Sequence, residues 1–201
     1  MPAFDAIKRV AIPIDIRNCD TDQIIPARFL KVEPESDDYA RCLFHDLRFA
    51  PNGDPVRDFI FNDARYRGAG IVVADHNWGC GSSREQAVWV LAANNIQCVI
   101  APSFADIHYS NCVKQGILPV VLPESDCERL REHLHEAAGE EIAVDLQQQT
   151  ITAINGSVFN FTIDAFDKEC LLQGLDDIGL TQQFETSIDD FERQRVDYDW
   201  L

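Results

Sequence analysis

The sequence predicts an α/β domain with a mixed β-sheet flanked by helices and a helical C-terminal tail. Two buried apolar runs, at 70–74 and 98–101, flank a helix-length segment at 83–94. This pattern favours parallel strands with crossover helices. Shorter strand-like segments joined by turns follow after residue 142, and these favour antiparallel pairing. The length of 201 residues fits one domain, residues 1–201, large enough to stand on its own core.

The remaining elements follow from apolar periodicity and from turn and cap signals. A first strand at 9–16 leads into a polar loop at 18–22, and Ile24 and Ile25 begin a short buried segment. Residues 33–63 form a long loop broken by prolines, with room for a helix at 39–49, and such loops often carry specificity. Further helices are expected at 105–115, ended by Gly116, and at 125–138, and further strands at 117–122, 142–146, 150–153 and 158–163, the last two joined by an Asn155-Gly156 hairpin.

The tail, residues 165–201, is predicted to be helical and acidic. Its apolar side chains recur at helical spacing, so we expect them to dock on the domain. The residues concerned are Leu171, Leu172, Leu175, Ile178, Leu180 and Phe184.

Composition excludes several classes of function. The chain has 34 Asp and Glu against 17 Lys and Arg, a net charge of -17, which repels nucleic acid and anionic membrane surfaces. No segment approaches the roughly 20 apolar residues of a membrane span, and the first residues do not resemble a secretory leader. The seven cysteines are scattered and form no CxxC pair, which indicates a reduced compartment and no metal site. A cytoplasmic protein acting on small molecules is expected.

The segment 75–85, Asp-His-Asn-Trp-Gly-Cys-Gly-Ser-Ser-Arg-Glu, joins a buried strand to a helix, which is where open α/β sheets place their ligands. Gly79 and Gly81 allow a ligand close to the backbone, and the helix start supplies free N–H groups. Ser82 and Glu85 have the spacing of a capping box. Because Arg84 adds a fork of donors suited to a carboxylate, the loop is predicted to bind an anion.

Three other anion loops fit less well. A Walker A loop needs a lysine before its final Ser or Thr, and none lies between Lys31 and Lys114. A dinucleotide-binding loop needs a third glycine where Arg84 stands, and a nucleophile elbow needs a glycine two residues after its serine. The alternative without chemistry is that Ser82 and Ser83 only cap a helix while Arg84 pairs with surface acids.

A family resemblance enters at these residues. Residues 79–85 resemble the GxGSSRE loop of the swivelling domain of the aconitase superfamily. Residues 20–30, 100–107 and 161–181 resemble, in the same order, segments of the small subunits of bacterial 3-isopropylmalate dehydratases, which act in leucine biosynthesis. One departure is Gln86, where the family commonly has histidine. The resemblance implies a swivelling β/β/α domain with a mixed sheet.

The resemblance also implies a reaction, the isomerisation of 2-isopropylmalate to 3-isopropylmalate by loss and return of water through isopropylmaleate. Ser82 would be the base that removes a proton next to a carboxylate, and Arg84 would bind that carboxylate. Asp22, Ser83 and Arg28 would bind substrate, although Asp22 can equally be a turn residue and Ser83 a helix cap. His76, His108 and Cys80 are interpreted as structural residues rather than catalysts.

The same resemblance places a [4Fe-4S] cluster on a separate large subunit, with no cofactor bound by this chain. The expected partners are therefore a cluster-bearing large subunit, in a heterodimer, and a small dicarboxylate substrate. Two alternatives stay open. The first is the small subunit of a related hydro-lyase acting on homoaconitate, citraconate or dimethylmalate, with residues 33–63 as the discriminating surface. The second is an anion-binding module without catalysis.

Overall fold

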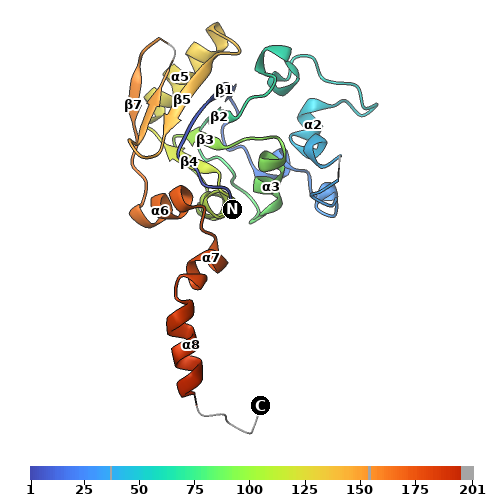
Figure 1. The fold of residues 1–201 in the computed structure, drawn as a ribbon. Coiled ribbons are helices and arrows are strands. Elements are labelled where there is room, and N and C mark those ends of the chain that lie inside the picture. The colour runs from blue at the N-terminus through green and yellow to red at the C-terminus, as the bar shows by residue number, and fades with distance from the viewer. Residues whose placement is uncertain (37, 154, 196–201) are drawn as a thin grey trace.

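The computed structural model describes residues 1–36, 38–153 and 155–195. Within these residues the centre of the fold is a seven-stranded sheet in the order β4-β3-β2-β1-β5-β6-β7 (Figure 1). Strands β4, β3, β2 and β1 are parallel, and β5, β6 and β7 are antiparallel. The predicted mixed sheet is confirmed. The strands are β1 Ala6–Ile14, β2 Ile71–Ala74, β3 Cys98–Ala101, β4 Leu118–Val121, β5 Glu141–Asp145, β6 Thr150–Thr152 and β7 Val158–Asn160.

Helices connect and cover these strands. Two of them, α3 between β2 and β3 and α4 between β3 and β4, are the crossovers that parallel pairing requires. The helices are α1 Thr21–Ile24, α2 His45–Arg48, α3 Gln86–Ala93, α4 Asp106–Lys114, α5 Glu124–Glu136, α6 Ala165–Gln173, α7 Asp177–Gln182 and α8 Glu185–Gln194.

Strand β1 changes partner halfway along its length. Residues 6–10 pair with β5, and residues 11–14 pair with β2. Pro13 lies in the second half, opposite Val73. Because proline has no N–H to donate, it is tolerated in a strand where one side needs no ladder bond. Pro13 therefore leaves no unpaired N–H donor in the part of β1 that pairs with β2 alone.

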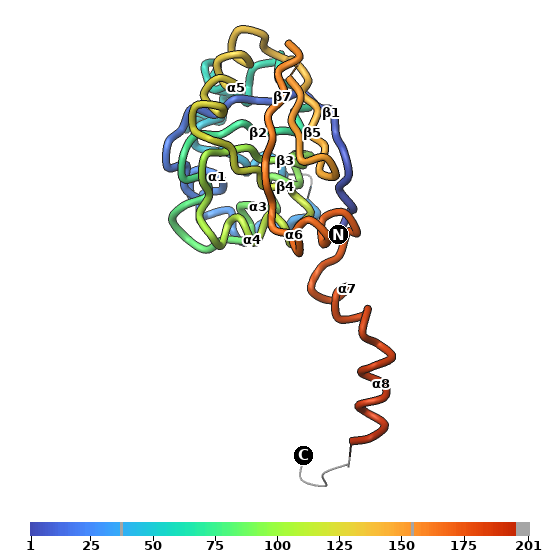
Figure 2. The backbone as a smooth tube through the Cα atoms, turned by 90° about the vertical axis from the view of Figure 1, so that its left-hand side faces the viewer, coloured from blue at the N-terminus to red at the C-terminus, as the bar shows by residue number. Residues whose placement is uncertain are grey.

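Alternate side chains of the strands pack into two apolar cores, one on each face of the sheet. Ile12 and Ile14 lie in the core beneath α3 and the 20–66 segment, whereas Ala11 lies in the other core, with α5 and the β5–β7 strands. Both faces are covered (Figures 1 and 2), which explains why β2 and β3 are apolar along their whole length.

The segment between β1 and β2 is less helical than predicted. The expected helix at 39–49 is a 3₁₀ turn at Tyr39–Cys42 followed by the single turn α2. Phe44 separates them with a left-handed backbone, φ 50°, a conformation that L-residues rarely adopt within a helix. Its ring is fully buried against Trp78. Burial of this aromatic side chain thus overrides helix propensity here.

The tail is helical as predicted, but only its first part docks on the sheet. Leu171 is fully buried, and the Phe4 amide donates to its carbonyl at 2.8 Å. Ile178 and Phe184 are 69% and 62% exposed, so the prediction that they dock on the domain is wrong. Residues 196–201 of the predicted tail lie outside the described residues. No helix among the described residues is long and apolar enough to span a membrane.

Candidate functional site

The 75–85 loop leaves the end of β2 and is held by backbone hydrogen bonds to two neighbouring segments. On one side, Gly79 N–H donates to the Cys19 carbonyl at 2.8 Å. On the other side, Trp78 N–H donates to the Ser103 carbonyl at 3.0 Å, and Ala105 N–H donates to the Trp78 carbonyl at 2.9 Å. The ends of β1, β2 and β3 therefore meet at this loop, as the α/β pattern predicts.

Thr21 fixes the serine part of the loop, a role that the sequence analysis missed. Its hydroxyl donates to the Ser82 carbonyl at 3.0 Å and accepts from the Ser82 N–H at 3.2 Å, and the residue is 1% exposed. The Thr21 N–H also donates to the Cys80 carbonyl at 2.9 Å. One signal for this arrangement is in the sequence: Asp20 and Gln23 have capping-box spacing, and they form that box at the start of α1.

The helix after the loop begins later than predicted. We expected a helix from Ser83 with Ser82 and Glu85 as a capping box, but α3 begins at Gln86 and its first turn has no side-chain cap. Because both backbone polar groups of Ser82 bond to Thr21, the chain stays in the loop conformation through Ser82. The Glu85 carboxylate instead accepts from the Gln115 amide at 3.0 Å. The Ser82–Glu85 capping-box prediction is wrong.

The helix that presents its start to the serines is α4. A cavity of about 230 Å³ lies between the loop and this helix, lined by Gly79, Gly81, Ser82, Ser83 and Arg84 together with residues 105–108. The first N–H groups of a helix lack helical acceptors and carry partial positive charge. The start of α4, rather than that of α3, therefore borders the serines, and Asp106 of its first turn is among the lining residues. Binding of a small anion here stays a prediction.

Arg84 and Asp22 form a two-pronged ion pair beside this cavity. Both guanidinium Nη atoms donate to the Asp22 carboxylate, Nη2 to Oδ2 at 2.9 Å. The hydrogen bond from Arg84 lowers the pKa of Asp22 below its usual range, so the carboxylate is charged at neutral pH. The Arg84 side chain is 14% exposed. Arg84 thus pairs with an exposed acid, as the alternative without chemistry expected, in a forked geometry that would equally fit the carboxylate of a ligand.

Ser82 and Ser83 are both exposed at the cavity. Among the described residues, neither side-chain hydroxyl has a hydrogen-bond partner in this chain. A serine hydroxyl is a weak base until a neighbouring group takes or stabilises its charge. Since Asp22 already neutralises the nearby Arg84, the chain by itself leaves both hydroxyls unactivated.

Arg28 lies apart from these residues. It forms an ion pair with Asp46, its Nη1 donating to Oδ2 at 2.8 Å, and its guanidinium stacks on the Phe29 ring. The pair with Arg28 lowers the pKa of Asp46 to about 2. Arg28 does not line the cavity beside Ser82, so its role in substrate binding stays a prediction.

His108 is the buried floor of the cavity. It is 3% exposed, packs against Trp78 with the ring centroids 6.4 Å apart, and has no partner for either ring nitrogen among the described residues. Burial lowers the pKa of His108 to about 4, so the ring is neutral at pH 7. The packing agrees with the interpretation of His108 as a structural residue. Cys80 is partly exposed, and its thiol donates to the Asn18 carbonyl at 3.3 Å.

His108 makes folding stability depend on pH. Because its pKa is lower in the folded state than its usual 6.5, the unfolded chain binds the extra proton between pH 6.5 and 4. The contribution of His108 to stability is therefore fully present above pH 6.5 and falls by about 3 kcal/mol as the pH drops to about 4. In His108→Phe we expect this pH-dependent loss to disappear, while stability at pH 7 falls by about 1–3 kcal/mol, since the larger ring has to fit against Gly79 in a fully packed site. Denaturant unfolding of both proteins between pH 6.5 and 4 measures the difference. An equally steep loss of stability with falling pH in the variant would contradict the role given to His108.

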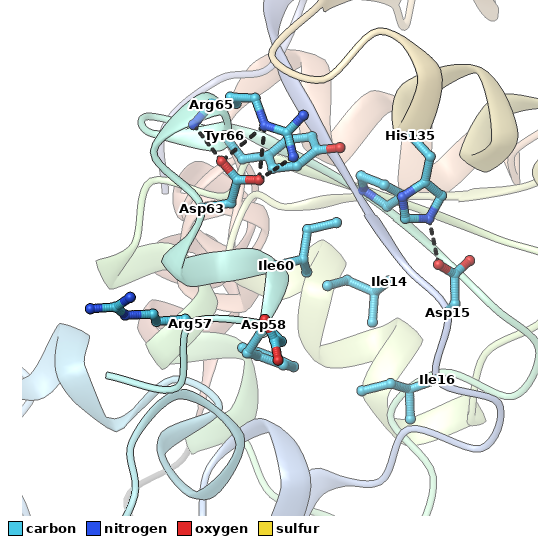
Figure 3. Close-up of a pocket in the computed structure, with 12 residues that line it drawn as sticks. Ile14, Asp15, Ile16, Arg57, Asp58, Ile60, Asp63, Arg65, Tyr66 and His135 are labelled. Carbon is cyan, nitrogen blue, oxygen red and sulfur yellow. Dashed lines mark hydrogen bonds and ion pairs between the residues drawn. The ribbon is translucent and has the colours of Figure 1, made fainter. Parts of the chain in front are cut away.

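A larger cavity, of about 560 Å³, opens between the end of β1, residues 57–66 and His135 (Figure 3). Four of its charged side chains pair with one another: Arg65 contacts Asp63, and His135 contacts Asp15. Arg57 and Asp58 also line it. Below it, Arg131 donates to Asp15 and to the Ala74 carbonyl at 2.8 and 2.9 Å, which ties α5 to the ends of β1 and β2. We therefore assign this region to support of the sheet edge.

No group of three or more His, Cys, Asp or Glu that could hold a metal ion occurs among the described residues. The cysteines do not offer thiolates, because burial raises the pKa of all seven thiols. An iron–sulfur cluster needs converging thiolates. The side chains of this chain do not fit such a cluster.

Relatives of this chain are found both with family models and among known proteins. A family model for the aconitase C-terminal domain matches residues 1–125, and a LeuD_N model matches residues 128–165. The chain is 46% identical over 193 residues to the 3-isopropylmalate dehydratase small subunit of Roseobacter denitrificans, covering 96% of each chain. It is 47% identical over 193 residues to the protein of the same name from Cereibacter sphaeroides, again with 96% of each covered.

A solved structure shows the same fold. It is the 3-isopropylmalate dehydratase of Methanocaldococcus jannaschii, which superposes with a TM-score of 0.66 at 25% identity, covering 92% of this chain and 98% of that one. The fold expected from the GxGSSRE loop, a mixed sheet flanked by helices of the aconitase type, is confirmed. The chain belongs to the aconitase superfamily, in the family of 3-isopropylmalate dehydratase small subunits.

Proposed function

We propose that this chain, as one swivelling domain, is the small subunit of a hydro-lyase that isomerises 2-isopropylmalate to 3-isopropylmalate in leucine biosynthesis. The observation that carries the proposal is the joint placement of Ser82, Ser83 and Arg84 at one cavity facing the start of α4. The ion pair between Arg84 and Asp22 supports it, because the Arg84 guanidinium already binds a carboxylate. Family membership supports the same reaction.

In this mechanism Arg84 binds a substrate carboxylate, which replaces or shares the place of Asp22. Neutralising that carboxylate makes the adjacent C–H more acidic. Ser82 first gives up its own hydroxyl proton to solvent or to a group of the partner. Its alkoxide Oγ then takes the substrate proton and becomes a hydroxyl again, while Ser83 binds a substrate oxygen from the next position. Asp22, once displaced from Arg84, can accept from a substrate hydroxyl. The N–H groups at the start of α4 stabilise negative charge in the cavity.

The reaction also needs help for the departing hydroxide, and the residues that the structure describes offer no group of ligands for a metal that would give it. We propose that a partner large subunit carries a [4Fe-4S] cluster and faces the Ser82 loop in the heterodimer. The Ser82 hydroxyl is unactivated in this chain alone, and we expect it to become a base only when substrate and partner are bound. Cytoplasmic localisation follows as part of the proposal.

Reconstitution tests the function. Mixing the purified chain with a cluster-loaded large subunit is expected to give turnover of 2-isopropylmalate, whereas the chain alone gives none. Homoaconitate and citramalate serve as comparison substrates, and faster turnover of either would reassign the substrate within the same class. Turnover by the chain alone, or none by the mixture, would overturn the proposal.

A further inference from the structure

Large apolar side chains are exposed at the end of the described chain, on α8 and at its N-cap. Phe184 is 62% exposed, Ile188 is 38% exposed and Phe191 is 67% exposed. Successive spacings of four and three residues place all three on one face of the helix. We refer to Phe184, Ile188 and Phe191 as the α8 stripe. A soluble chain rarely leaves a continuous apolar face uncovered unless something binds it.

The helix that carries the stripe stands away from the sheet. Figures 1 and 2 both show α8 projecting beyond α6 and α7, in two views at right angles. The base of the projecting segment is the start of α7, where Lys114 of α4 donates to Asp177 at 2.9 Å and the N-terminal amine lies 3.8 Å from Asp176. The stripe is therefore presented outward from an anchored base.

The polar residues of α8 are mainly acidic. Glu185, Asp189, Asp190 and Glu192 outnumber Arg193, which pairs with Asp189 and Asp190 in its own helix. A second copy of this chain would bring another net charge of -17 towards these acids, which disfavours self-association. The complementary surface is an apolar groove with a basic rim, on a different protein.

We infer that the α8 stripe docks into such a groove on the large subunit. The inference rests on the proposed function for the existence of this partner, and adds the surface that binds it. The members of this family are named small subunits, so a large partner is the other protein that this surface would meet. An amphipathic helix laid in a groove is a common form of protein recognition.

The position of the stripe suits a tether. Helix α4 runs from Asp106, beside the Ser82 cavity, to Lys114, which donates to Asp177 of α7. The cavity and the start of α7 therefore lie at opposite ends of a nine-residue helix, about 13 Å long at 1.5 Å per residue, and α8 lies beyond α7. A partner bound at α8 would not need to cover the serine loop. The small subunit can then stay attached while the catalytic face opens for substrate.

The test is binding of the full-length double variant Phe184→Ser/Phe191→Ser to the purified large subunit, measured by calorimetry. We expect the Kd to rise about 100-fold, as for the loss of central interface aromatics, and wild-type binding to weaken with rising salt. Val158→Ser is the matched control, since Val158 is 56% exposed on β7, and its Kd should match the wild type. Circular dichroism and Tm confirm that each variant is folded.

Turnover separates this inference from the proposed function. At saturating small subunit, the double variant should recover wild-type kcat, because Ser82 and Arg84 are untouched. Ser82→Ala should show the reverse, with normal binding and lost turnover. An unchanged Kd in the double variant overturns the inference, as does a wild-type homodimer in sedimentation that the double variant converts to monomer.

Discussion

Replacing Ser82 with alanine is expected to lower kcat of the reconstituted enzyme by about 10³-fold or more. The change removes the hydroxyl that we propose takes the proton, and no other hydrogen-bonding group of this side chain is lost, because its backbone contacts to Thr21 remain. Substrate affinity, measured as Kd rather than KM, should stay within about threefold of wild type. Steady-state turnover and equilibrium binding of 2-isopropylmalate provide the two measurements.

Ser83→Ala is the matched control for this experiment. Ser83 is the adjacent residue, is also exposed, and borders the same cavity. If it contributes one hydrogen bond to substrate, its loss costs about tenfold in kcat/KM. Equal losses in both variants would show that the loop acts only as a binding surface. Full activity in Ser82→Ala would remove Ser82 from the mechanism.

The strands could be predicted because runs of apolar residues in the sequence indicate strands that are buried on both faces. Residues 71–74 and 98–101 are apolar throughout, since both faces of β2 and β3 are covered. The ends of β7 were overestimated: strand pairing stops at Asn160, although Phe161 is still buried. Phe161 still donates to the Gln149 carbonyl at 3.0 Å, so the difference lies at residues 162–163, which the apolar pattern had included in the strand.

The candidate site was predictable in its residues but not in its local geometry. The Gly79–Arg84 motif correctly pointed to a loop at the end of β2, yet the helix start that faces it belongs to α4. The hydrogen bonds of Ser82 to Thr21 join residues 61 positions apart. Local capping rules do not include such contacts, so they favoured a cap at Ser82.

The tail shows a similar limit. Helical spacing from Leu171 to Phe184 predicts an apolar face that docks on the domain, but Ile178 and Phe184 are exposed, and the exposed Ile188 and Phe191 of α8 were not included in the prediction. Spacing does not say which surface covers that face. The prediction placed these side chains on the domain itself, whereas α8 projects beyond α7 (Figure 2) and its large apolar side chains are exposed.

Replacing Gly79 with alanine is expected to destabilise the protein by about 4 kcal/mol and to abolish turnover. A Cβ at this position would lie 2.2 Å from Cγ of His108, and the backbone has φ +73°. His108 cannot give way easily, because it is 3% exposed and packed on Trp78, which is fully buried. The loop would have to move away from α4, and the Ser82 cavity would lose its shape. Thermal and denaturant unfolding measure the stability, and reconstituted turnover measures the activity.

Two other glycines separate the backbone effect from the collision with His108. Gly53 has a similar backbone, φ +86°, but a Cβ there would meet nothing within 4 Å, so Gly53→Ala should cost only the left-handed conformation, about 1–2 kcal/mol. Gly81, at φ +89°, would place its Cβ 3.3 Å from Cβ of Asp20, and its alanine variant should lie between the two. If Gly79→Ala were no worse than Gly53→Ala, the close packing of the loop on His108 would not be what holds the cavity in place.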